Sequence, residues 1–263
     1  MVITAGIDVG SVTTKAVLLL GSDYRGVIRP TGPDPRQAGT GALEELLSVA
    51  GLSLKDVDFI VGTGYGRASL PFINKAVTEI TCHARGAHHL LKGTGTVIDI
   101  GGQDSKVIVT DPEGRVVDFA MNDKCAAGTG RFLQVMAGVL GAGLSELGEW
   151  GRAALPAPVN SMCAVFAESE VIGLLAKGVA KEEIAAGICR SVAQRVAAMA
   201  ARVGARGPVL FTGGVAKNPG VRKFLSDELG EEVIVFPESQ MAGAIGAALL
   251  ARECVLKTGV REK

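Results

Sequence analysis

The sequence predicts an α/β fold made of two duplicated lobes that face each other across a cleft. Segments with β-strand composition alternate with helical segments along the chain, which is typical of α/β architecture. In addition, residues 5–20 and 96–111 share residue types at a constant offset of 91 positions, as Asp8 and Asp99 illustrate. A run of matches at one offset indicates an internal duplication. We therefore expect one lobe over residues 1–94 and another over residues 95–263.

Composition and charge narrow the function. Lysine plus arginine equals aspartate plus glutamate at 27 each, so the basic excess of a nucleic-acid-binding protein is absent. No apolar run approaches the roughly 18 residues of a membrane helix, and the N-terminus lacks the pattern of a signal peptide. We expect a soluble, cytoplasmic protein without a membrane or nucleic-acid partner. Five cysteines, an odd number without framework spacing, argue against a disulfide scaffold.

The first third of the chain predicts a hairpin, a loop and two helices. Residues 3–9 and 14–20 are rich in β-forming residues and flank a Gly-Ser turn, so they predict a hairpin. Residues 21–40 predict a loop, because Pro30, Pro33 and Pro35 argue against a helix. Residues 42–50 place leucines at helical spacing. We next expect a buried strand over 57–62, a glycine turn over 63–67 and a helix over 76–91.

The rest of the chain repeats the hairpin and then becomes mainly helical. Residues 96–111 predict the second hairpin, and residues 116–205 predict a mostly helical region with a long alanine-rich helix over 184–203. Residues 209–211 predict a strand that ends in two glycines, and Asn218 and Pro219 predict the start of a helix. A final strand over 233–236 precedes a final helix over 242–251.

The two hairpin turns have the residue types of a polyphosphate site. Glycines that follow a strand expose backbone N–H groups, and two such turns facing each other can hold phosphates. Asp8 and Asp99 supply the oxygen ligands that Mg²⁺ prefers, and we expect them to act through water molecules of the ion's hydration shell. The candidate nucleotide-binding residues of the turns are Gly10, Ser11, Thr13, Thr14, Lys15, Gly101, Gly102 and Gln103. The alternative is two ordinary hairpins with aspartates in their turns.

A third glycine motif extends this site. Gly213 and Gly214 follow a predicted buried strand, and small residues there suit the flat face of a purine; Asn218 lies just beyond. The signal is weak alone, since Gly-Gly after a strand is commonly only a turn. The sequence contains neither a GxxxxGK[ST] P-loop nor a GxGxxG after its first strand, so it is neither a P-loop nor a Rossmann protein.

Two cysteines stand apart from the other three. Cys125 lies in the segment MNDKCAAGTGRFLQV and Cys163 in NSMCAVFAESEVIGLL, each ahead of a predicted helix. We interpret them as half of a metal site whose other half comes from a second copy of the chain. Burial as small apolar residues is the alternative. Cys82, Cys189 and Cys254 lie in apolar helical runs, so we expect them to pack in the core.

These motifs together resemble a known superfamily and one family within it. GIDVG, DIGG and FTGGVAKN resemble the phosphate-1, phosphate-2 and adenosine motifs of the actin/Hsp70/sugar-kinase ATPase fold, with two lobes around a nucleotide cleft. NDKCAAGTGRF and NSMCAVFAESEVI, with TGYGR and DIGGQDSK, resemble the ATPase activators of 2-hydroxyacyl-CoA dehydratases and the ATPase subunits of benzoyl-CoA reductase. The resemblance extends from Gly6 to Leu250.

The resemblance implies a homodimer that binds ATP or ADP with Mg²⁺ and holds one [4Fe-4S] cluster, with Cys125 and Cys163 of each chain as ligands. It implies an oxygen-sensitive ATPase that takes an electron from ferredoxin or flavodoxin and delivers it to an iron–sulfur dehydratase or reductase. Asp99, Gln103 and Asp104 are all candidates for orienting the hydrolytic water. The alternatives are a reductase of another partner, such as a double-cubane cluster protein, a small-molecule kinase of the same fold, or a regulatory ATPase without redox activity.

Overall fold

The chain forms two compact units. The computed structural model describes residues 2–160 and 163–258. The first unit comprises Met1–Gly93, Thr110–Val116 and Phe236–Lys263, and the second comprises Thr94–Val109 and Val117–Val235. The C-terminal segment therefore groups with the first unit, whereas the sequence placed all of 95–263 in one lobe. The reason is the last helix, α8 (Ala242–Thr258), which packs against strands and a helix of the first unit.

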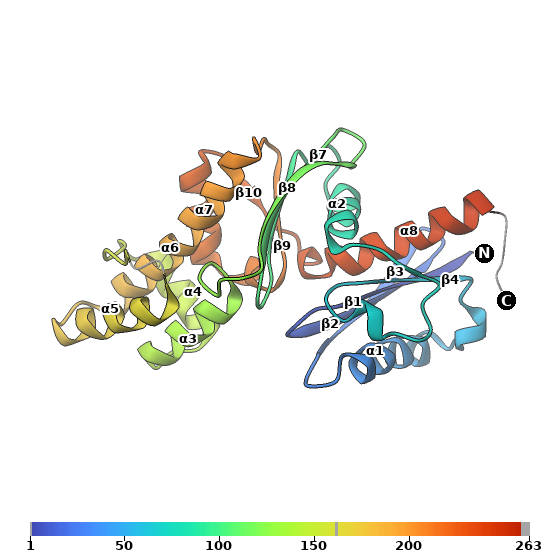
Figure 1. The fold of residues 1–263 in the computed structure, drawn as a ribbon, viewed down its shortest axis with the longest axis horizontal. Helices are drawn as coiled ribbons and strands as arrows, with labels where there is room; N and C mark the ends of the chain where they lie inside the picture. The colour runs from blue at the N-terminus through green and yellow to red at the C-terminus, as the bar shows by residue number, and fades with distance from the viewer. Residues whose placement is uncertain (1, 161–162, 259–263) are drawn as a thin grey trace. The chain divides into compact units, whose positions relative to one another are not determined.

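The first unit is a five-stranded sheet with helices on both faces (Figure 1). The strand order is β3-β2-β1-β4-β5, with β1 antiparallel to β2 and parallel to β4. Alternate side chains of β1 and β2, including Ile7 and Leu18, pack with α1, whereas Val17 and Leu19 pack with α8. The elements are β1 (Ile3–Val9), β2 (Thr13–Leu20), β3 (Asp23–Pro30), α1 (Pro35–Ala50), β4 (Phe59–Thr63), β5 (Lys75–Ala76), α2 (Glu79–Leu90) and α8.

The loop predicted for residues 21–40 is wrong. Asp23–Pro30 forms β3, which pairs antiparallel with β2 along its whole length. Helix α1 begins at Pro35, because proline at the first helical position needs no N–H partner and its fixed φ suits the helix. Asp34 caps this helix by accepting hydrogen bonds from the N–H groups of Arg36 and Gln37 at 2.9 and 3.1 Å. The proline marked the start of the helix and did not prevent it.

Glycines allow α8 to lie directly against α2 and β1. A Cβ at Gly246 would collide with the carbonyl of Cys82 in α2, and one at Gly6 would collide with the backbone of α8 at Ala244. At Gly86, a Cβ would collide with the carbonyl of Ala242. Because these obstacles are backbone atoms, rotation of a side chain cannot relieve them. Close packing of α8 therefore depends on the absence of side chains at these three glycines.

Gly246→Ala should therefore destabilise the protein although it improves helix propensity. Overpacking typically costs about 1–3 kcal/mol, which exceeds the gain of about 1 kcal/mol from replacing a helical glycine. Urea unfolding of both variants measures the difference. The matched control is Gly138→Ala in α3, where nothing lies within 4 Å of the added Cβ. Equal midpoints for the two variants would contradict this account of the α2–α8 contact.

The second unit repeats the strand arrangement of the first. Its sheet has the order β10-β9-β6-β7-β8, with β6 antiparallel to β7 and parallel to β9, as β1 is to β2 and β4. The predicted duplication of the hairpin thus corresponds to one repeated topology. The elements are β6 (Thr96–Ile100), β7 (Ser105–Thr110), β8 (Val116–Asn122), α3 (Gly130–Leu140), α4 (Leu144–Ala153), α5 (Ala164–Ala176), α6 (Lys181–Arg202), β9 (Val209–Thr212), α7 (Pro219–Leu229) and β10 (Val233–Ile234).

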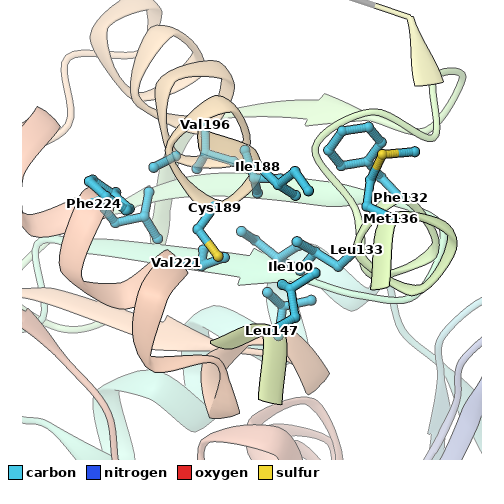
Figure 2. Close-up of a cluster of buried hydrophobic side chains, with 14 of the residues drawn as sticks. Ile100, Phe132, Leu133, Met136, Leu147, Ile188, Cys189, Val196, Val221 and Phe224 are labelled. Carbon is cyan, nitrogen blue, oxygen red and sulfur yellow. The ribbon is translucent and has the colours of Figure 1, made fainter. Parts of the chain in front are cut away.

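One large apolar core holds the second unit together. Figure 2 shows Cys189 among Ile100, Leu147, Val221 and neighbouring side chains of this cluster. Cys82 in the first unit is also fully buried, so packing is confirmed for these two cysteines. Cys254 is only partly buried.

The helical prediction for 116–205 is wrong over its first seven residues, which form β8. Within the described residues, no helix is both long and apolar enough to cross a membrane.

Candidate functional site

The first hairpin pairs Asp8 with a buried lysine. Asp8 lies near the end of β1 and is 4% exposed. Its Oδ2 is 3.2 Å from Nζ of Lys15, which the antiparallel register places directly opposite on β2. Since the cation faces the carboxylate, the charge of Asp8 is compensated within the hairpin.

Thr31 braces the same turn from the end of β3. Its hydroxyl donates to the carbonyl of Gly10 at 2.7 Å and lies 2.9 Å from the hydroxyl of Thr14. The N–H of Gly10 donates to the carbonyl of Thr13 at 3.1 Å. Thr14 is fully buried by this contact, whereas Ser11 and Thr13 are partly exposed. The hydroxyls of Ser11 and Thr13 are therefore more accessible to a ligand than that of Thr14.

The second hairpin turn has a richer set of charges. Lys106, 2% exposed, places its Nζ 3.3 Å from Oδ2 of Asp99 and 2.8 Å from Oδ2 of Asp104. The hydroxyl of Thr212, at the end of β9, donates to Oδ1 of Asp99 at 2.9 Å. Gln103 is exposed at the tip of the turn. Neither Lys106 nor Thr212 was predicted to be a site residue, although the match of Lys106 to Lys15 at the offset of 91 residues was a usable signal.

The glycine motif after β9 lies against Asp99. Gly213 has a φ of 85°, a left-handed conformation that glycine adopts without strain. A Cβ there would lie 2.9 Å from Oδ1 of Asp99. Asn218 caps α7 by accepting from the N–H of Val221 at 2.9 Å, as its position before a proline predicted. Asn218 is mostly buried by this structural role, whereas Gly214 is exposed.

Cys125 lies in the loop ahead of α3 and not directly at the helix N-terminus, where the sequence predicted it. Helix α3 begins only at Gly130. The side chain of Asn122 shapes the loop, because it accepts from the N–H of Cys125 at 3.2 Å and donates to the carbonyl of Cys125 at 2.9 Å. It also donates to the carbonyl of Ala127 at 3.3 Å. The thiol itself is exposed.

The same loop is hydrogen-bonded to the second hairpin turn. The N–H of Gly130 donates to the carbonyl of Gly101 at 2.9 Å, and the N–H of Arg131 donates to the carbonyl of Gly102 at 2.8 Å. These donors are N–H groups of the first turn of α3, which have no partner within their own helix. The end of the cysteine loop is thereby fixed to the turn that holds Gly101 and Gly102.

Cys163 is the N-cap of α5, as the sequence predicted. It is exposed, and its carbonyl accepts from the N–H of Ala167 at 2.9 Å. Glu170 accepts from the N–H of Asn160 at 3.1 Å and so ties α5 to the preceding segment. Ser161 and Met162, which belong to the same sequence motif, lie outside the described residues.

The other cysteines differ in chemistry as well as in burial. Burial raises the pKa of both the Cys82 and the Cys189 thiol to about 12. A thiol with so high a pKa stays protonated near neutral pH, and only the thiolate is a good metal ligand. Over residues 2–160 and 163–258, no group of three or more His, Cys, Asp and Glu side chains is placed to hold a metal ion. Of the five cysteines, Cys125 and Cys163 are exposed, Cys254 is partly buried, and Cys82 and Cys189 are buried.

The fold and these turns define the class of protein. Two solved structures, the ethanolamine utilization protein EutJ from Carboxydothermus hydrogenoformans and a ROK family glucokinase from Streptomyces griseus, align over 95% of the chain. Their TM-scores are 0.63 and 0.54 at 17% and 15% identity, and they cover 90% and 99% of those chains. The predicted fold class is confirmed: the chain has the α/β fold of the actin/Hsp70/sugar-kinase type.

Within this class, the chain belongs to the BadF/BadG/BcrA/BcrD ATPase family, whose model matches residues 5–251. It is 46% identical to the activator of lactoyl-CoA dehydratase from Anaerotignum propionicum, covering 97% of this chain and 99% of the relative.

Two solved structures are also similar over almost the whole chain. Component A of the Acidaminococcus fermentans (R)-2-hydroxyglutaryl-CoA dehydratase has a TM-score of 0.93 at 45% identity and 97% and 100% coverage. The Clostridium difficile 2-hydroxyisocaproyl-CoA dehydratase activator, solved with ADPNP, has a TM-score of 0.91 at 41% identity and 99% and 98% coverage. As a member of this family, the chain is an ATPase.

Proposed function

We propose that this chain is the ATP-dependent activator of an iron–sulfur enzyme, a 2-hydroxyacyl-CoA dehydratase. Two copies of the chain hold one [4Fe-4S] cluster, and hydrolysis of ATP accompanies delivery of a low-potential electron from that cluster to the dehydratase. Ferredoxin or flavodoxin is the electron donor. The names and the full-length similarity of the dehydratase activators support the proposal.

In this proposal, the nucleotide binds at the two hairpin turns and at the glycine motif after β9. The phosphates lie against the two turns that contain Gly10, Gly101 and Gly102. The N–H groups of Gly10 and Gly101 donate within their own hairpins, so other N–H groups of the turns contact the phosphates. Asp8 and Asp99 hold Mg²⁺ through its water ligands. Gly213 and Gly214 lie beside the purine. The partly exposed Ser11 and Thr13, together with the exposed Gln103, add polar contacts.

The observation that carries the redox half is the exposure of Cys125 and Cys163. A [4Fe-4S] cluster takes four thiolate ligands, and each chain has two exposed cysteines, so two copies complete the set. The buried thiols of Cys82 and Cys189, with pKa values of about 12, do not compete for iron. When bound, the cluster supplies one-electron redox chemistry. The N–H groups at the start of α5 point toward Cys163 and stabilise negative charge there by about 0.3–1 kcal/mol.

The backbone hydrogen bonds of Gly130 and Arg131 connect the two halves. They join the turn proposed to bind phosphate to the loop that carries Cys125. A shift of Gly101 and Gly102 on nucleotide exchange therefore moves the base of the cysteine loop. Helix dipoles alone are too weak to change a reduction potential greatly, so the position and solvent exposure of the cysteine loop account for most of the coupling.

Iron analysis of anaerobically purified protein tests the proposal. One [4Fe-4S] per dimer corresponds to about two irons per chain, with a broad brown absorption that dithionite bleaches. The protein should elute as a dimer. Colourless, iron-free protein that hydrolyses ATP would contradict the proposal and favour the kinase or regulatory alternatives. Electron transfer to a purified dehydratase, compared with a double-cubane cluster protein or a benzoyl-CoA reductase, then identifies the partner.

A further inference from the structure

Lys106 is a buried cation shared by two carboxylates. Its side chain is 2% exposed, and its Nζ lies 3.3 Å from Asp99 and 2.8 Å from Asp104. The side chain of Asp99 is 4% exposed and that of Asp104 is 26% exposed. Burying an ammonium group is costly unless it is paired, and the two carboxylates supply that pairing for Lys106. Lys106 in turn keeps a deep and a shallow carboxylate close together.

The first hairpin serves as an internal reference for this arrangement. Lys15 lies 3.2 Å from Asp8, as Lys106 does from Asp99. At the offset of 91 residues, however, the position of Asp104 is held by Thr13 and that of Gln103 by Val12. The second turn has thus one carboxylate more than the first, and its lysine bridges two partners. The two hairpins therefore differ at Gln103 and Asp104, which are candidates for orienting the hydrolytic water.

The bridge also fixes the other oxygen of each carboxylate. Oδ1 of Asp99 accepts from Thr212 at 2.9 Å. Oδ1 of Asp104 lies over the turn, where it would be 2.6 Å from a Cβ at Gly101. The N–H of Gly101 donates to the carbonyl of Asp104 at 2.9 Å, which holds the two residues together. Each Oδ2 is therefore directed at Lys106, and each Oδ1 has its own defined surroundings.

We infer that Lys106 is a positioning residue for ATP hydrolysis. It holds Asp99 and Asp104 in fixed orientations around the turn, and its burial keeps it from contacting phosphate itself. This inference rests on the placement of the nucleotide at this turn in the proposed function. It assigns Lys106 a role different from that of Lys15, which neutralises a single carboxylate in the other turn.

The test separates positioning from binding and from stability. Lys106→Met should lower kcat for ATP hydrolysis roughly 100-fold, as expected for misplaced groups, with little change in the KM for ATP. Because this variant removes the cation that lies between two carboxylates, Lys106→Met is also made in an Asp104→Asn background. There it should lower kcat about tenfold below Asp104→Asn alone through Asp99, with unchanged ADP binding per chain and a cooperative thermal transition. Lys92→Met, at an exposed position, is the control.

Two outcomes would overturn the inference. Equal kcat values for Asp104→Asn with and without Lys106→Met would show that the lysine only stabilises the fold. A raised KM with unchanged kcat would show that it binds the nucleotide directly. Asp99→Asn separates these outcomes from failure of the site assignment: if that substitution leaves hydrolysis unaffected, the nucleotide is not at this turn. None of these readouts requires iron.

Discussion

Replacing either Cys125 or Cys163 by alanine should remove the iron from anaerobically purified protein while leaving nucleotide bound. Each chain has only two fully exposed cysteines, so a single substitution leaves a dimer with two of four thiolates. The buried thiols cannot replace the missing ligands, because they would have to leave the core and lose a proton from a group with a pKa of about 12. Iron content and the absorption spectrum measure the loss, and ADP binding per chain measures the nucleotide site.

Cys254→Ala is the matched control for this experiment. Cys254 is partly buried on α8 in the first unit, away in sequence from both cysteine motifs, so its substitution should leave the iron content unchanged. In iron-free protein near pH 8, iodoacetamide should modify Cys125 and Cys163 well before Cys82 and Cys189. Retention of iron and of the dimer in Cys125→Ala would refute the shared cluster and leave the two exposed cysteines without a role in metal binding.

The repeated hairpin was predictable because its chemistry is local. Strand, Asp-x-Gly turn and strand recur at one offset, and the pairing of Asp8 with Lys15 and of Asp99 with Lys106 follows from the antiparallel register. The return of α8 to the first unit was not predictable in the same way. It depends on contacts made by glycines such as Gly246 with residues far away in sequence.

The errors in secondary structure have specific physical causes. Pro35 was treated as a helix breaker, although proline fits the first helical position and Asp34 supplied a capping signal directly before it. Strand β8, at the edge of its sheet, shows no clear alternation, because only Ala120 is buried and residues 117–119 are all exposed. Without a period of two residues, the segment gave no strand signal.

The candidate site was predictable by position but not by role. Motif glycines and aspartates identified the turns, whereas Thr14 and Asn218 proved to be occupied by Thr31 and by the cap of α7. Lys106 and Thr212 were missed because their importance depends on which carboxylate oxygens they reach. Those contacts depend on the packing of β9 beside β6, which residue spacing does not specify.

Gly130→Ala should abolish the response of the Cys125 loop to nucleotide. An added Cβ would lie 3.0 Å from the carbonyl oxygen of Gly101, 3.3 Å from a methyl group of Val215 and 3.4 Å from the Cα of Gly102. The first two distances are shorter than ordinary van der Waals contacts, so the start of α3 and the turn separate by a few tenths of an ångström. That movement lengthens the hydrogen bonds from Gly130 and Arg131, through which the turn and the loop are joined.

Hydrogen exchange over residues 122–131 and the alkylation rate of Cys125 in iron-free protein measure the response. Both should differ between ADP and a non-hydrolysable ATP analogue in the wild type and in Gly138→Ala, where the added methyl group meets nothing within 4 Å on the same helix. Both should become independent of the nucleotide in Gly130→Ala, although each protein still binds it. If Gly130→Ala responds as Gly138→Ala does, the signal reaches the cysteine by another route. Loss of the response in Gly130→Ala alone would show that two backbone hydrogen bonds carry the state of the nucleotide to the loop that holds Cys125.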